Sequence, residues 1–296
     1  MNDLKLIQDY KHLPEYRLSF NELAAQVFHI DFEQWYKRGC WDDTYTCYSY
    51  IDGNTVVANL SVSRMKLVLN GQHYKGIQIG TVMTHPDYRS RGLSRKLLEF
   101  VLAEYEAKCD LMYLFANKSV LDFYPKFGFT PVREASFTMP ASNQEPKCSS
   151  LRQLDVNAAA DWKLIQTLAA ERQPISQQCG VMGATGIFLW YCLNVFGEDI
   201  YLIEDTQTLV IAQYEDKELH VFDVISQEPV ELTALLAAIV SREISSVHFH
   251  FTPQFNDIEV AAAPSLVEPD TTLFIRANSA RLSLPSPLRF PLVAQA

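Results

Sequence analysis

The feature of the sequence that most constrains the fold is a strand, a basic loop and a helix in direct succession. The apolar run Ile77–Met83 is typical of a strand, and Pro86 ends it because proline donates no ladder hydrogen bond. Apolar residues then recur at helical spacing from Leu93 to Tyr105. The loop between them carries one glycine and two arginines, and Arg95 follows in the first turn of the helix. A glycine loop that leads into a helix N-terminus offers unpaired N–H groups to an anion, most often a phosphate.

The charge of the chain narrows the range of partners. The net charge is −10 over 296 residues, which disfavours nucleic acid as a main partner and favours cationic ligands. Against this background the cluster Arg89, Arg91, Arg95 and Lys96 is a local basic island. The anion-binding interpretation of the loop therefore agrees with its charge.

Cysteine spacing and hydropathy indicate a cytoplasmic protein. The six cysteines are scattered without a Cys-x-x-Cys pair, so the sequence supports neither a zinc site nor a disulfide framework, and we expect no metal. The N-terminus lacks a basic-then-apolar signal pattern. The longest apolar stretch, Gly186–Phe196, is too short to span a bilayer, so we expect no membrane partner. A homo-oligomer is left open.

The first 140 residues have the pattern of an α/β (α+β) domain. Helical spacing covers residues 15–28 and 31–38, and hairpin signals occur at Asp52-Gly53-Asn54 and Asn70-Gly71. The short apolar run 111–115 is typical of a buried central strand, and Ala135–Met139 is expected to be the last strand. The segment 140–150 is polar and has prolines at positions 140 and 146, so we expect residues 141–150 to be a linker between domains 1–140 and 151–296.

The second half follows the same order of elements. Helices are expected at residues 157–172, 186–196 and 229–242, the last with Ser226 as a cap, and strands at 199–203, 208–214, 219–225, 247–251 and 272–276. No glycine follows Gly197, so this half cannot build a second glycine loop. We therefore expect a degenerate copy of the first half without a phosphate site. A sterol-carrier-like fold is the alternative.

Two motifs give the first half a resemblance to a known family. Arg89, Gly92 and Ser94 match the acetyl-CoA motif Gln/Arg-x-x-Gly-x-Gly/Ala of the GNAT N-acetyltransferases, with serine in the small-residue position. Downstream, Asn117 and then Tyr124-Pro-Lys-Phe-Gly-Phe129 resemble the family's Tyr-x-x-x-Gly-Phe signature. The resemblance implies a GNAT fold with a mixed, largely antiparallel central sheet flanked by helices, and a likeness to Eis-type acetyltransferases.

The resemblance also implies residues for the co-substrate, acetyl-CoA. The pyrophosphate would bind the loop N–H groups, the pantetheine arm would pair with the strand end, and Asn117 would either bond that arm or cap the next helix. The implied cofactor residues are Val82, Met83, Thr84, Arg89, Ser90, Arg91, Gly92, Leu93, Ser94, Arg95 and Asn117. Tyr124 is the expected general acid toward the CoA thiolate, although a merely buried aromatic is the alternative.

The acceptor amine is less clearly marked. An aromatic and acidic cluster precedes the first hairpin and could enclose a cation, or it could simply pack the two helices together. Its members are Glu33, Trp35, Tyr36, Trp41, Asp42 and Asp43. His85 is expected in a turn, and His248 and His250 share one strand face, as edge or core residues rather than metal ligands.

The sequence thus predicts acetyl transfer from acetyl-CoA to a primary amine within one ternary complex, without an acyl-enzyme. A backbone N–H of the strand end would stabilise the oxyanion. The rivals are a non-catalytic acyl-CoA-binding or sensor protein and a transferase with a longer acyl donor or an aminoacyl donor.

Overall fold

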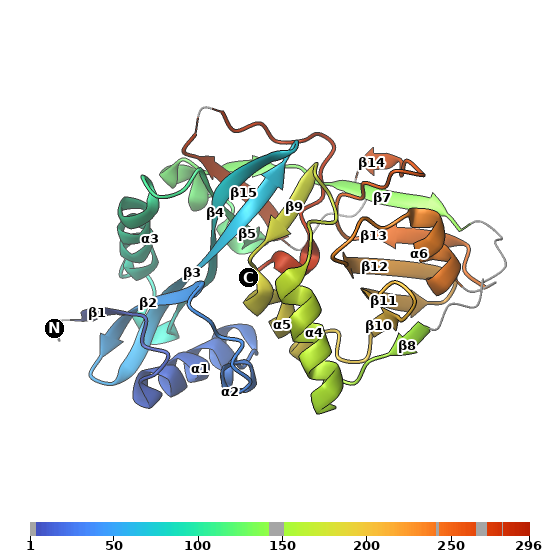
Figure 1. Cartoon of the computed structure of the whole chain (residues 1–296). Coiled ribbons are helices and arrows are strands. Elements are labelled where there is room, and N and C mark those ends of the chain that lie inside the picture. The colour runs from blue at the N-terminus through green and yellow to red at the C-terminus, as the bar shows by residue number, and fades with distance from the viewer. Residues whose placement is uncertain (1–3, 142–150, 241–242, 265–270, 280) are drawn as a thin grey trace.

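The chain forms two β-sheet units that lie side by side, with helices packed around them (Figure 1). This computed structural model describes residues 4–141, 151–240, 243–264, 271–279 and 281–296. Both sheets are mixed and largely antiparallel, because each contains one parallel pair, β4 with β5 and β12 with β13. This confirms the predicted fold class.

The first sheet has the strand order β1-β2-β3-β4-β5-β15-β6, and β9 adds to β3. The turn between β3 and β4 is a two-residue hairpin in which Asn70 and Gly71 both have positive φ, as the Asn-Gly pair predicts. Its strands are β1 (Lys5–Gln8), β2 (Tyr45–Asp52), β3 (Thr55–Leu69), β4 (Gln72–Thr84), β5 (Leu111–Asn117), β6 (Thr130–Val132), β9 (Cys179–Met182) and β15 (Thr271–Ala277).

Helices cover both faces of this sheet. α3 (Leu93–Tyr105) buries Leu97 and Val101 against one face, while α1 (Pro14–Phe28) and α2 (Glu33–Lys37) pack on the other. The predicted apolar face of α3 is buried except for Leu102, which is half-buried. Three short 3₁₀ turns complete the unit: η1 (Pro86–Tyr88), η2 (Lys118–Val120) and η3 (Tyr124–Phe127).

The second sheet has the order β14-β7-β13-β12-β11-β10-β8. Its strands are β7 (Ala135–Pro140), β8 (Leu151–Gln153), β10 (Ile200–Ile203), β11 (Thr208–Glu215), β12 (Glu218–Ile225), β13 (Ser246–Phe249) and β14 (Ala262–Pro264). Its helices are α4 (Ala159–Glu171), α5 (Thr185–Asn194) and α6 (Leu232–Ile239), and η4 (Leu292–Ala294) lies near the end of the chain. Along the described residues, no helix combines the length and the apolar character that crossing a membrane requires.

The two sheets exchange strands. β7, expected to finish the first half, pairs with β13 of the second sheet, and β15, expected in the second half, lies between β5 and β6 of the first. A single apolar cluster joins Phe20 and Trp35 of the first unit to Phe188 and Ile211 of the second. The division at residue 140 stays a prediction, and most of the expected linker, residues 142–150 with Cys148, lies outside the described residues.

Candidate active site

A groove opens where β4 and β5 part. The two strands pair only over Gly76–Gln78 and Leu111–Tyr113, and beyond this point their ends diverge. A groove of about 600 Å³ lies between the diverging ends and the start of α3. Its lining includes all but one of the implied cofactor residues: Val82, Met83, Thr84, Arg89, Ser90, Gly92, Leu93, Ser94, Arg95 and Asn117. The fold therefore brings the two sequence motifs together around one opening.

The loop at the groove leaves the start of α3 open. Ser90 and Gly92 both adopt the left-handed region, with φ of +62° and +74°. Gly92 is the N-cap residue of α3, and within the described residues no side chain caps the first N–H groups of the helix. The Ser94 hydroxyl instead lies 2.9 Å from that of Thr84 and joins the helix start to the end of β4. The first N–H groups of α3 are thus available to an anion.

The arginines of the loop are exposed and only lightly engaged. Arg89 Nε donates to the Thr84 carbonyl at 3.4 Å, and Arg95 forms an exposed pair with Glu99 at 3.5 Å. Arg91, the one implied residue outside the groove lining, donates to the Asp87 carbonyl at 2.7 Å. Exposed pairs of this kind are weak, so the positive charge can turn to a bound anion at little cost.

Asn117 has both of the expected positions. It lines the groove, and its Oδ1 accepts from the Ser119 N–H at 3.1 Å as the N-cap of η2. The capping role predicted as one alternative is therefore confirmed. A bond from Asn117 to the pantetheine arm stays a prediction.

Tyr124 lies beside the groove rather than in its lining. It is the first residue of η3, where Pro125 restarts the chain as a 3₁₀ turn. Its ring contacts Phe123 at a centroid distance of 5.2 Å, and Phe123 lines the groove. Burial raises the pKa of Tyr124 to about 12. The phenol is fully protonated at neutral pH, and its role as an acid stays a prediction.

Comparison with known proteins adds a family to this geometry. Residues 14–132 match the family model described as the acetyltransferase (GNAT) domain. This region is similar to a GNAT domain. A comparison with curated protein sequences gives no match.

Solved structures share the fold over both units. A conserved Enterococcus faecalis protein described as a probable N-acyltransferase aligns with a TM-score of 0.62 and 16% identity, over 93% of this chain and 72% of its own. Eis1 from Mycobacterium abscessus aligns with a TM-score of 0.58 and 13% identity, over 93% of this chain and 74% of its own. At these identities the likeness is one of fold, and it agrees with the predicted resemblance to Eis-type proteins.

The aromatic part of the expected acceptor cluster belongs to the core of the first unit. Trp35 and Trp41 are 2% and 5% exposed, and their rings stack at a centroid distance of 5.5 Å. Trp35 Nε1 donates to the Gly186 carbonyl of α5 at 2.7 Å, and Trp41 Nε1 donates to the Tyr45 carbonyl at 3.3 Å. Trp41 packs within the first unit and Trp35 also reaches α5, so core packing accounts for both indoles. The sequence had offered packing of the two helices as the alternative to a role in binding the amine.

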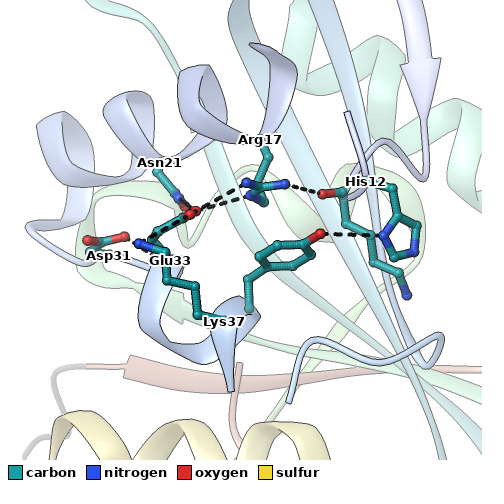
Figure 2. A network of polar contacts seen from close by, with 8 residues as sticks. His12, Arg17, Asn21, Asp31, Glu33 and Lys37 are labelled. Carbon is teal, nitrogen blue, oxygen red and sulfur yellow. Dashed lines mark hydrogen bonds and ion pairs between the residues drawn. The ribbon is translucent and has the colours of Figure 1, made fainter. Parts of the chain in front are cut away.

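Glu33 and Tyr36 belong to a polar network that ties α1 to α2 (Figure 2). The Glu33 carboxylate accepts from Arg17 Nε at 3.1 Å and from Asn21 Nδ2 at 3.2 Å. The Arg17 guanidinium also stacks 3.9 Å from the centre of the Tyr36 ring. These contacts fix the helix pair.

The two aspartates of the cluster are bonded to other residues of the first unit. Asp42 accepts from the Thr44 N–H at 2.8 Å, and Asp43 pairs with Lys11 at 2.5 Å. None of the six acceptor candidates is in the lining of the groove. Their role toward an amine stays a prediction.

The histidines and cysteines carry no metal site in the described part of the chain. No three His, Cys, Asp or Glu side chains are placed there to hold a metal. His85 Nδ1 accepts from the Asp87 N–H at 3.3 Å as the cap of η1, which confirms the turn prediction. His250 Nε2 lies 3.0 Å from His220 Nδ1. The free cysteines are Cys40, Cys47, Cys109, Cys179 and Cys192.

The corresponding position in the second unit is closed by its own carboxylate. α6 begins at Leu232, and Ser226 does not cap it, so that prediction is wrong. Asp257 accepts instead from the N–H groups of Leu232 at 2.9 Å and Thr233 at 2.8 Å. Although burial acts to raise the pKa of Asp257, the hydrogen bonds from Thr233 and Leu232 lower it to about 2. The carboxylate is therefore an anion at neutral pH at this helix start.

Sequence reasoning missed the residues behind the groove. A Cβ on Gly80 would lie 2.9 Å from the carbonyl of Ala296, so the last described residues pass directly against β4, between the two units (Figure 1). With its amide turned to satisfy its neighbours, Gln78 donates to the Ala294 carbonyl at 2.9 Å and accepts from the Ala296 N–H at 2.6 Å. A glycine inside a strand was the available signal, since it often marks a close backbone approach.

Proposed function

We propose that the protein transfers the acetyl group of acetyl-CoA to a primary amine in a ternary complex. The observation that carries the proposal is the groove of the first unit, where the open start of α3 and the free end of β4 meet. The amine nitrogen attacks the thioester carbonyl, the C–N bond forms and the C–S bond breaks. The amine loses a proton, and the CoA thiolate takes one up.

The pyrophosphate would bind at the start of α3. The N–H groups that follow Gly92 point out of the helix with the positive end of its dipole, and Arg89 and Arg95 line the same opening. Each charge-assisted hydrogen bond to a phosphate oxygen is stronger than a neutral one. Phosphate contacts of this kind anchor the cofactor without placing its reactive end.

The end of β4 would place the thioester. The His85 N–H donates to the Val57 carbonyl of β3 at 2.9 Å. Because alternate residues of a strand bond in opposite directions, the Val82 and Thr84 N–H groups then face the groove. One of them would donate to the thioester oxygen as it gains charge, and such a donor contributes roughly 3 kcal/mol to the barrier decrease.

Tyr124 would assist the leaving thiolate. Its pKa of about 12 exceeds the ordinary thiol pKa of roughly 8.5, so complete proton transfer from the resting phenol is uphill by about 5 kcal/mol. The phenol therefore contributes first as a hydrogen-bond donor to the sulfur. The proton follows as charge develops there.

The test is a release assay for free CoA. Purified protein is mixed with acetyl-CoA, propionyl-CoA or longer acyl-CoA and with polyamine, aminoglycoside or peptide amines, while calorimetry measures binding of each donor. Turnover with acetyl-CoA supports the proposal, and turnover only with longer donors supports the alternative transferase. Binding without turnover on any amine supports the sensor, and no binding of any donor refutes all three.

A further inference from the structure

A β-bulge interrupts β4 directly before the residues that line the groove. Asn59 pairs with Met83 and Ser61 pairs with Gly80, so Leu60 alone faces both Thr81 and Val82. The extra residue on β4 bends the strand at this point. The bend lies just beyond Gln78, the last residue of β4 that pairs with β5.

The bulge holds Thr81 in a conformation that its side chain disfavours. Thr81 has φ of +47°, in the left-handed region, where a β-branched residue is a true outlier. Such a conformation is strained and persists only where its surroundings enforce it. The neighbours of Thr81 must therefore supply that restraint.

Two side chains hold Thr81, one from the adjacent strand β3 and one from β2 beyond it. The fully buried Asn59 of β3 donates from Nδ2 to the Thr81 carbonyl at 2.8 Å. The hydroxyl of Tyr45 on β2 lies 2.8 Å from the Thr81 Oγ1, and Tyr45 is 4% exposed. A buried amide and a buried phenol are costly without partners, so both contacts are strongly enforced.

The network behind this grip extends away from the groove. Asn59 Oδ1 accepts from the Ser49 hydroxyl at 2.8 Å, and Ser49 Oγ lies 2.6 Å from the Tyr10 hydroxyl. Tyr10 is 2% exposed, and its hydroxyl is linked to Thr81 through Ser49 and Asn59. The network therefore offers a site where a buried tyrosine hydroxyl can be removed without a direct effect on Thr81.

We infer that Tyr45 is a positioning residue, which together with Asn59 holds the bulge at Thr81 and so sets the direction of the Val82 and Thr84 N–H groups. The inference rests on the acetyl transfer proposed above, because these N–H groups are the ones that would meet the thioester. The pyrophosphate site at the start of α3 does not depend on Tyr45. The loss of its hydroxyl should therefore affect the chemical step more than CoA binding.

The test uses Tyr45→Phe and Thr81→Val, which remove the two ends of one hydrogen bond and keep the ring and the β-branched shape. Because small misplacements at a reacting centre are costly, each should lower kcat about tenfold or more and change CoA affinity by less than about twofold. The double variant should be no worse than either single variant. Thr81→Ser keeps the hydroxyl and should have a kcat close to that of the wild type. Tyr10→Phe, which removes another buried tyrosine hydroxyl, is the matched control.

Hydrogen exchange gives a readout that does not need turnover. Amide exchange in residues 80–84 should rise in Tyr45→Phe and Thr81→Val but not in Tyr10→Phe. Wild-type exchange and wild-type kcat in Tyr45→Phe would overturn the inference, as would a loss of CoA affinity that matches the loss of kcat. A wild-type protein without turnover would refute the proposed function alone, and exchange would still decide whether Tyr45 holds the bulge.

Discussion

Replacing Gly92 with alanine tests whether the loop conformation serves the cofactor. A Cβ at this position would meet nothing within 4 Å, so the change adds no clash, and its cost comes from φ of +74° alone. A residue other than glycine pays about 1–2 kcal/mol in the left-handed region. If the loop relaxes to escape this strain, CoA must restore it on binding. The affinity should then fall by about 5- to 30-fold.

Gly71 provides a matched control. It has the same φ of +74° and the same free space, but it lies in the hairpin before β4, at the other end of that strand from the groove. A strand of 13 residues spans about 40 Å, so Gly71→Ala cannot touch the cofactor. Gly71→Ala should lose about 1–2 kcal/mol of unfolding free energy in urea, and Gly92→Ala should lose less, because its relaxed loop transfers the cost to CoA binding. Only Gly92→Ala should weaken CoA in a calorimetric titration.

The result that would refute this reasoning is a Gly92→Ala protein that binds CoA like the wild type, whether or not its unfolding free energy falls like that of Gly71→Ala. The left-handed glycine would then be a feature of folding only. A loss of affinity in both variants would equally contradict the argument, because strain far from the groove would be enough to weaken binding.

Three further outcomes follow from the structure. Because Tyr124 has a pKa of about 12, its phenol stays protonated as the pH rises. The wild type and Tyr124→Phe should therefore have kcat–pH profiles of the same shape between about pH 7 and 10. Asp257→Ala should lower the unfolding free energy by about 1 kcal/mol at pH 7. Since the pKa of Asp257 is about 2, below its unfolded value of about 3.9, this loss should shrink as pH falls from 4 toward 2 in urea titrations. Asp223→Asn breaks a buried pair with Arg172 and should cost about 3–5 kcal/mol, whereas Asp161→Asn at an exposed pair should cost below about 1 kcal/mol by the same measurement.

Local sequence patterns predicted many of the elements of the fold. The hairpin at Asn70-Gly71 and the helix from Leu93 depend on residues close in sequence, so their spacing was enough to place them. β7 and β15 were placed in the wrong sheets because strand character does not name a partner. β15 pairs with β5 across more than 150 residues of sequence, and only the folded chain decides such a contact.

The candidate site shows the same difference between what local sequence predicts and what only long-range contacts decide. The groove collects nearly all the implied cofactor residues, because they lie at the adjacent ends of β4 and β5 and at the start of α3. The sequence could not predict the hydrogen bonds that hold Thr81, because their partners, Tyr45 and Asn59, lie on separate strands. Trp35 and Trp41 show the opposite problem: aromatic residues near a site look the same in sequence whether they bind a ligand or pack a core.

The two units share one arrangement of strands and helix but differ at the start of that helix. Each has a parallel strand pair joined through a helix, β4 and β5 through α3, β12 and β13 through α6. At α3 a left-handed glycine begins the helix and leaves its first N–H groups uncapped within the described residues. At α6 the same N–H groups are bonded to Asp257, which arrives from a loop beyond β13. Both helix starts favour negative charge for the same reason. The second unit supplies that charge from its own chain, so an external phosphate would have to displace a bonded carboxylate there, whereas at α3 it would meet open N–H groups.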